Sequence, residues 1–217
     1  MSLLTAGVDE VGRGCLAGPV YAAAVILPEQ HGIVGLRDSK QLTAAKRELL
    51  APQIQARALA WAVGIATVEE IDRLNILRAT FLAMARAVQA LTLRPTLCLV
   101  DGNQVPQLGC EVRTIVGGDA TVESIMAASI VAKVARDAEL VRLDTQYSGY
   151  GLAQHKGYGT PEHLGALRTR GPCVIHRMSF APCAQAKLSG IRDGQAPEQP
   201  PAAVLDEARS PLMDSRP

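Results

Sequence analysis

Close to the N-terminus, an apolar run leads straight into two adjacent acids and a glycine-rich turn, GVDEVGRG at residues 7–14. Successive side chains of a strand point to opposite faces, so Asp9 and Glu10 converge on one point only where the strand ends or bends. Gly12 and Gly14 supply such a bend because glycine tolerates unusual backbone angles. The octet therefore predicts a strand that ends in a carboxylate pair, around which the remaining chain must be arranged.

Two like charges held together need a cation or a proton between them. All-oxygen carboxylate ligation suits Mg²⁺ or Mn²⁺. The bare amides of the two glycines let a phosphate or sugar approach, with Arg13 as charge partner. The octet alone is equally consistent with ordinary turn chemistry on a solvated strand end. A dinucleotide-binding fingerprint is disfavoured, because Gly12, Gly14 and Gly18 miss its spacing.

The length of 217 residues and the 48% hydrophobic content fit one domain with a substantial aliphatic core. The net charge of +1 neither requires nor excludes a polyanionic partner. Basic residues gather between positions 151 and 190, where five stand against the single acid Glu162. This stretch is either a solvated basic surface or an edge that faces phosphates.

Five cysteines, an odd number without a CxxC pair, indicate incidental thiols in a reducing compartment rather than a disulfide framework or zinc site. The eight residues before Asp9 are too few for a signal peptide, and no apolar run is long enough to cross a bilayer. We therefore expect a cytoplasmic protein without membrane contact, and a monomer.

Apolar runs predict strands over residues 3–8, 19–27, 58–67, 96–100 and 111–116. Helices are expected over residues 44–56, where Pro52 marks a kink or an early end, from Asn75 to about 93, from Thr121 to about 146, and over 161–171. This mixture indicates an α/β or α+β layer with a mixed sheet flanked by helices. The final residues, with five prolines after position 190 and no periodicity, predict a disordered tail.

Acids follow three of the predicted strands: the Asp9–Glu10 pair, Asp101 and Asp119. Ligands of open α/β sheets bind at the carboxyl ends of strands. If these ends are neighbours, four carboxylates surround one pocket, and the chemistry they suit is metal-assisted phosphoryl transfer to water. Taken singly, Asp101 could stand in a plain turn and Asp119 could cap the following helix.

Two acids within the predicted helix after Thr121, Asp137 and Asp144, are expected to be surface charges.

The motifs, in order and well spaced, resemble those of bacterial ribonuclease HII, the type 2 ribonuclease H. The resemblance rests on DEVGRG at 9–14, DSK at 38–40, NIL at 75–77, DGN at 101–103, GD at 118–119, AASIVAKV at 127–134, HKGYGT at 155–160 and HRMSF at 176–180. Met126 and Met178 depart from the family pattern, and Met178 removes a charge from the expected nucleic-acid edge.

This resemblance implies a ribonuclease H-like fold, a five-stranded mixed sheet flanked by helices, over residues 1–188, with a Pro-rich tail at 189–217. It implies endonucleolytic cleavage of RNA in RNA–DNA hybrids and 5′ of single ribonucleotides embedded in duplex DNA. The products would carry 5′-phosphate and 3′-hydroxyl ends. Asp9, Glu10, Asp101 and Asp119 correspond to the catalytic carboxylates that bind Mn²⁺ or Mg²⁺.

The resemblance also assigns Gly12, Arg13 and Gly14 to the ribose 2′-hydroxyl and nearby phosphates, and Tyr158 to the ribo–deoxyribo junction. Only a 2′-hydroxyl contact distinguishes ribose from deoxyribose at one position. Candidates for further phosphate contacts are Ser39, Lys40, Ser129, Lys133, His155, Lys156 and Arg177.

Three other interpretations of the sequence remain open. Ribonuclease HIII shares the core but carries an additional N-terminal domain, for which a site starting at Asp9 leaves no room. A different metal-dependent phosphatase or nuclease would use the same carboxylates. A hybrid-binding module with structural acids would bind its ligand equally well in chelator, whereas an enzyme would need metal for turnover.

Overall fold

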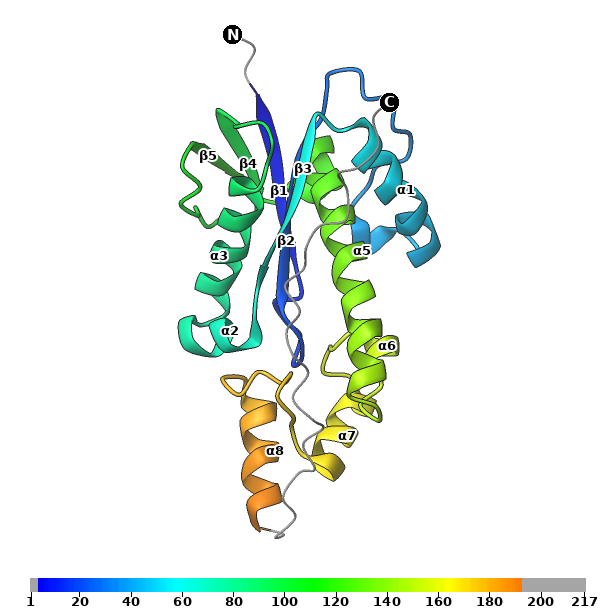
Figure 1. Cartoon of the computed structure of the whole chain (residues 1–217), viewed down its shortest axis with the longest axis vertical. Coiled ribbons are helices and arrows are strands. Elements are labelled where there is room, and N and C mark those ends of the chain that lie inside the picture. The colour runs from blue at the N-terminus through cyan, green and yellow to red at the C-terminus, as the bar shows by residue number, and fades with distance from the viewer. Residues whose placement is uncertain (1–3, 193–217) are drawn as a thin grey trace, which may run out of the picture.

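The strand that carries the acids lies at the centre of a five-stranded sheet in the computed structural model, which describes residues 4–192 (Figure 1). The strand order is β3-β2-β1-β4-β5. The strands span β1 Thr5–Val11, β2 Val20–Ile26, β3 Ala60–Ala66, β4 Leu97–Asp101 and β5 Glu111–Ile115. Pairing is antiparallel between β1 and β2 and between β2 and β3, and parallel from β1 through β4 to β5. The sheet is therefore mixed, as predicted.

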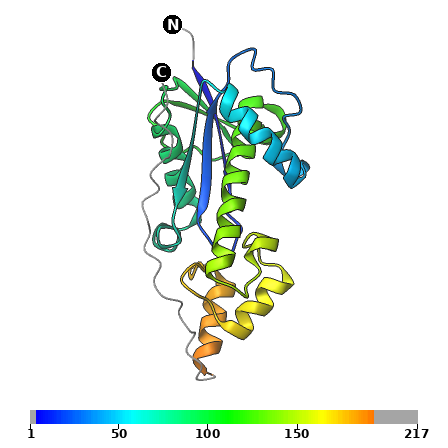
Figure 2. The ribbon, with the colours of Figure 1, turned by 45° about the vertical axis from the view of Figure 1, so that its right-hand side comes forward.

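Helices cover both faces of this sheet, and a group of helices lies beyond one end of it (Figures 1 and 2). The helices are η1 Ser39–Gln41, α1 Ala44–Arg57, α2 Val68–Leu74, α3 Ile76–Gln89, α4 Gly118–Thr121, α5 Glu123–Gln146, α6 Leu152–His155, α7 Pro161–Arg170 and α8 Ala181–Arg192. α2 and α3 lie on one face, α1 and α5 lie on the other, and α6, α7 and α8 form the extension.

Side-chain caps explain where three of the helices begin. Thr43 and Asn75 accept hydrogen bonds from main-chain amides in the first turns of α1 and α3. Thr67 and Glu70 form a reciprocal capping box at the start of α2. These short polar side chains satisfy amides that the helix itself leaves unpaired, so the starts follow from local sequence.

Glycines allow the helices to approach the sheet closely. A Cβ on Gly7 of β1 would lie 2.1 Å from the main-chain carbon of Ser124 in α5. A Cβ on Gly64 of β3 would lie 2.0 Å from the carbonyl oxygen of Ala83 in α3. Small residues on both helices complete these contacts, so the core is built from alanine and aliphatic side chains.

The observed elements differ from the predicted ones in four places. β1 continues to Val11, so Asp9 and Glu10 lie within the strand rather than after it. Pro52 lies inside α1 without ending it, and Asp119 lies within the short α4 instead of capping α5. The sequence analysis did not identify α8.

α8 extends to Arg192, beyond the predicted domain boundary at residue 188, and the remainder of the predicted tail lies outside the described residues. Within residues 4–192, no helix combines the length and apolar character needed to traverse a bilayer.

Candidate active site

The carboxylates meet where β4 ends beside β1. Val8 is the last residue of β1 that pairs with β4, opposite Val100, and Asp101 ends β4. Asp9 and Glu10 still pair with β2 on the other side. The bend inferred from the sequence is thus unnecessary, because the end of the neighbouring strand opens the space beside the two acids.

Three of these acids, Asp9, Glu10 and Asp101, lie close enough to repel one another electrostatically. Asp9 is only 5% exposed, and burial, followed by the charges of Glu10 and Asp101, raises its pKa well above the usual range. Burial also raises the pKa of Glu10, against the opposing influence of Arg13, whose Nη1 lies 3.2 Å from Glu10 Oε1. A bound cation would reduce this repulsion, so the arrangement is typical of a cation-binding site.

Asp119 joins the same group from α4, the short helix that follows β5. Its main-chain amide donates to Asp101 Oδ1 at 3.4 Å, and Lys40 Nζ donates to its Oδ2 at 3.3 Å. Burial disfavours the charge on Lys40, but the hydrogen bond and charge of Asp119 outweigh this effect and raise the Lys40 pKa. The structure therefore brings all four predicted carboxylates into one neighbourhood.

The donor set suits a hard divalent cation, because it consists of carboxylate oxygens whose charges repel one another. Among residues 4–192, no three Asp, Glu, His or Cys side chains are already arranged so that they could hold a metal ion together. Two of the carboxylates are instead engaged by basic side chains, Glu10 by Arg13 and Asp119 by Lys40. A metal ion that binds here competes with these two cations.

Two buried arginines hold the glycine-rich loop that follows β1. Arg136 of α5 is fully buried and donates to the carbonyls of Pro19, Lys156 and Ala17 at 3.1, 2.9 and 3.1 Å. Gly12 has φ +95°, and its missing Cβ would lie 2.1 Å from Arg136 Nε. Only glycine can therefore occupy position 12 without displacing Arg136.

The predicted phosphate contact of Arg177 is contradicted by its burial. Its side chain is 0% exposed and donates to the carbonyls of Gly18 and Arg13, the latter at 2.9 Å. In a trans peptide the C=O and N–H point in opposite directions, so a carbonyl held inward by Arg177 turns the Gly14 N–H outward. A Cβ on Gly14 would meet nothing within 4 Å, so the loop is open to solvent on the side-chain side of this residue.

Tyr158 lies beside the same loop. It forms an isolated antiparallel bridge with Cys15, and the residue is 42% exposed. Lys133 Nζ lies 5.8 Å from the centre of its ring. The late tyrosine motif and the N-terminal glycine loop, distant in sequence, thus form one surface.

The other predicted phosphate contacts divide into buried and accessible groups. Ser39 and Ser129 are buried, and their hydroxyls are 2.6 Å apart, so they support the loop before α1 rather than face solvent. Lys40 is 79% exposed in its side chain, whereas Lys133 pairs with Asp137 at 2.7 Å. The ammonium group of Lys156 donates to the carbonyl of Ala153.

His155 points its Nε2 at the carbonyl of Tyr150, 2.7 Å away, and Met178 packs into the apolar cluster between α5 and α8.

Several residues of this region have roles that the sequence analysis missed. Asp137 binds Lys133 and Arg47, and Asp144 accepts from the Leu152 amide at 2.7 Å, so neither is a free surface charge. His163 and His176 are buried, and their Nε2 atoms lie 3.1 Å apart, within hydrogen-bonding distance. His163 Nδ1 also contacts the main-chain carbonyl of Tyr158. The clustering of histidines near Tyr158 was the only available signal.

Comparisons with known proteins agree with this geometry. The family model described as ribonuclease HII matches residues 6–183. A ribonuclease HII from Bordetella pertussis is 62% identical over 179 residues, which cover 82% of this chain and 89% of the relative.

Solved structures give the same result. Ribonuclease H2 from Pyrococcus horikoshii has a TM-score of 0.74 and 27% identity, covering 86% of this chain and 98% of that one. Ribonuclease HII from Archaeoglobus fulgidus, solved in complex with PCNA, has a TM-score of 0.71 and 26% identity, covering 88% and 100%. The chain therefore belongs to the ribonuclease HII family of ribonuclease H hydrolases, endoribonucleases that act on RNA–DNA hybrids.

Proposed function

We propose that this enzyme, beyond cutting RNA in RNA–DNA hybrids, cleaves duplex DNA on the 5′ side of a single embedded ribonucleotide. The products would carry 5′-phosphate and 3′-hydroxyl ends. The observation that carries the proposal is the proximity of the carboxylates to an outward-facing amide. Asp9 and Glu10 stand on β1, and the Gly14 amide follows a few residues later in the loop held by Arg177. Hydrolysis and sugar recognition would thus occur side by side.

Asp9, Glu10, Asp101 and Asp119 are the proposed catalytic residues and would hold Mn²⁺ or Mg²⁺. When bound, the ion would activate water and stabilise the leaving oxygen of the phosphodiester. The carboxylates themselves must be ionised to bind it, and burial and repulsion raise the pKa of Asp9 and Glu10. Activity should therefore increase as the pH rises and these two groups lose their protons.

The loop formed by Gly12, Arg13 and Gly14 would read the ribose. A main-chain N–H can donate to a 2′-hydroxyl oxygen, and a deoxyribose offers no such acceptor. Tyr158, exposed and bridged to Cys15 at the edge of the loop, would stack on the sugar or base at the junction. A lone ribonucleotide would satisfy both contacts, so a longer RNA stretch is unnecessary.

Lys40, Lys133 and Lys156 are the remaining candidates for contacts with backbone phosphates. Of these, Lys40 is the most exposed and lies beside Asp119. We also propose that the protein acts as a monomer in the cytoplasm, in the repair of ribonucleotides left in DNA.

The test uses a labelled DNA duplex with one internal ribonucleotide, incubated with Mg²⁺ or Mn²⁺, and an all-DNA duplex as the substrate control. A single cut 5′ of the ribonucleotide is expected, absent from the all-DNA duplex, in chelator and with the Asp101→Asn variant. End-labelling after phosphatase treatment identifies the 5′-phosphate. Cleavage of long hybrids without cleavage of this duplex would refute the proposal while leaving the family assignment intact.

The role of Tyr158 is tested separately with Tyr158→Ala. We expect this variant to lose its preference for the single-ribonucleotide duplex over a long hybrid. An unchanged preference would contradict the proposed junction contact.

A further inference from the structure

We propose that Cys98 and Cys110 form a redox-sensitive dithiol, which hydrogen peroxide converts into an intramolecular disulfide bond and which an added dithiol regenerates by reducing that bond. This modification site lies between β4 and β5, and its existence does not depend on the proposed substrate preference.

The two thiols are already in contact. Cys110 Sγ lies 3.3 Å from Cys98 Sγ, in hydrogen-bonding distance. Cys98 lies in β4, and Cys110 immediately precedes β5, in a register that pairs Leu97 with Glu111. A disulfide bond is about 2 Å long, so the sulfur atoms must approach by only about 1 Å. The parallel pairing of β4 with β5 holds the two thiols together, although only Cys98 lies within a strand.

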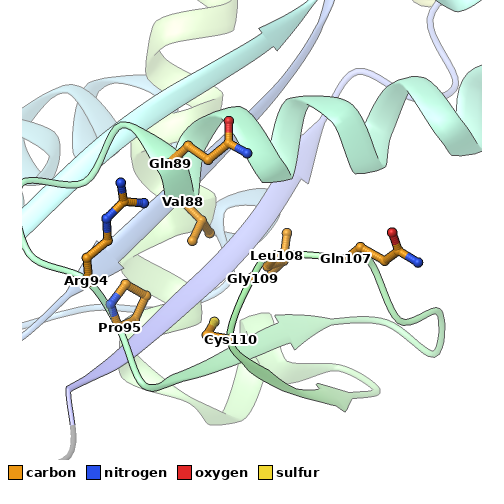
Figure 3. Close-up of a pocket in the computed structure, with 8 residues that line it drawn as sticks. All are labelled: Val88, Gln89, Arg94, Pro95, Gln107, Leu108, Gly109 and Cys110. Atoms are coloured by element: carbon orange, nitrogen blue, oxygen red, sulfur yellow. The ribbon is translucent and has the colours of Figure 1, made fainter.

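A cavity makes one of the two thiols accessible. A space of about 430 Å³ lies between the end of α3 and the segment that leads into β5, and Cys110 lines it together with Val88, Gln89, Arg94 and Leu108 (Figure 3). Cys110 is half-buried, whereas Cys98 is fully buried behind it in the apolar core. A small oxidant can therefore reach Cys110 before it reaches Cys98.

This difference in access sets the order of the chemical steps. The sulfur of Cys110 attacks hydrogen peroxide, which yields a sulfenic acid and one water molecule. The sulfur of Cys98 then attacks the sulfenic sulfur, and its proton leaves with the departing hydroxide as a second water molecule. Two thiols are oxidised and one peroxide is reduced. Burial raises the pKa of Cys98, so its thiol stays protonated until the sulfenic acid forms beside it.

The bond would close a loop that contains Asp101. It would join β4 and β5 near their first residues, whereas Asp101 stands at the last residue of β4. The carboxylates should therefore keep their positions, and the cross-link should restrict mainly the unfolded chain. We expect an oxidised protein that is more resistant to heat than the reduced protein and that keeps its nuclease activity.

The full chain is treated with hydrogen peroxide, alkylated without reduction, and measured by mass spectrometry. The expected product is lighter than the reduced protein by about 2 Da before alkylation and carries two fewer alkyl groups. Proteolysis should yield one cross-linked pair of peptides containing Cys98 and Cys110, which dithiothreitol separates. The melting temperature should rise by roughly 5–10 °C on oxidation.

Cys110→Ser should abolish the mass loss and the change in melting temperature. Cys173→Ser is the matched control, since Cys173 is also half-buried but contacts His176 rather than a thiol, and this variant should still form the bond. A mass loss that persists in Cys110→Ser, a cross-link between other cysteines, or oxidation of Cys110 only to sulfinic acid would each overturn the proposal. Because Cys110 is half-buried, its serine variant should fold.

Discussion

Replacing Gly12 by alanine tests whether a buried arginine determines the shape of the glycine-rich loop. The added Cβ would lie 2.1 Å from Arg136 Nε and 2.7 Å from its Cδ and Cζ, and Gly12 has φ +95°. Gly14→Ala is the matched control two residues away, because its Cβ would meet nothing within 4 Å. Both variants add one methyl group to the same loop, at a crowded position in Gly12→Ala and at an open position in Gly14→Ala.

The structure sets the size of the expected effect. An alanine held at positive φ costs about 1–2 kcal/mol. Arg136 is fully buried and makes three hydrogen bonds to carbonyls, so it cannot move without losing at least one. A lost hydrogen bond of a charged donor costs about 1.5–3 kcal/mol. We expect Gly12→Ala to lower the free energy of unfolding by about 4 kcal/mol and Gly14→Ala by less than about 1 kcal/mol.

Urea denaturation followed by circular dichroism measures both changes, and cleavage of the single-ribonucleotide duplex measures function. Gly14→Ala should fold normally but bind substrate more weakly, because its methyl group occupies the space through which a sugar would approach. If Gly12→Ala unfolds at the same urea concentration as Gly14→Ala, the positioning of the loop by Arg136 is refuted.

Three further predictions concern the core, the buried histidines and the metal. Gly64→Ala should lower the free energy of unfolding by about 3 kcal/mol in urea denaturation, because its Cβ would lie 2.0 Å from the main-chain oxygen of Ala83, which no rotamer change can relieve. Burial, and secondarily the neighbouring His163, lowers the pKa of His176 to about 4, so only the unfolded chain takes up this proton between pH 6.5 and 4. Between pH 7.5 and pH 5, the free energy of unfolding should therefore fall by about 2 kcal/mol more in the wild type than in His176→Gln; an equal fall in the two proteins, measured by urea denaturation at both pH values, would contradict this. Mn²⁺ at about 100 times its dissociation constant should stabilise the wild type by about 3 kcal/mol, and removal of the metal by chelator should reverse the rise in melting temperature. An equal stabilisation of Asp101→Asn would place the ion elsewhere.

Local sequence was sufficient for features that depend on neighbouring residues. The α3 helix follows from the Asn75 cap and from apolar residues at helical spacing, and Ala79, Ala83, Met84 and Ala87 of this stripe are buried. The five strands followed from short apolar runs, although their ends shifted by a few residues. Both signals work because the periodicity of a helix or strand repeats within a few residues of chain.

The placement of the acids was predicted in part. Three strand-end positions suggested a common pocket, and the hydrogen bond between the Asp119 amide and Asp101 joins two of them. The end of β4 beside Val8 could not be predicted from β1 alone, because it depends on pairing with Val100 and its neighbours, far along the sequence. The sequence analysis attributed the meeting of the acids to a bend at Gly12, whereas the acids meet where β4 ends beside β1.

Arg177 shows what a motif cannot reveal. A basic residue in a basic segment favours a phosphate contact, yet Arg177 turns inward to the carbonyls of Gly18 and Arg13. The same holds for Ser39 and Ser129, which meet across ninety residues of sequence, and for Cys98 of β4 and Cys110, which immediately precedes β5. Sequence by itself determined the five strands, the main helices and the family, and it identified the four acids as candidate ligands, because these depend on residue type and local spacing. Only the tertiary structure decided which polar side chains face solvent and which support the loop from within, because burial and partner choice arise when distant segments pack together.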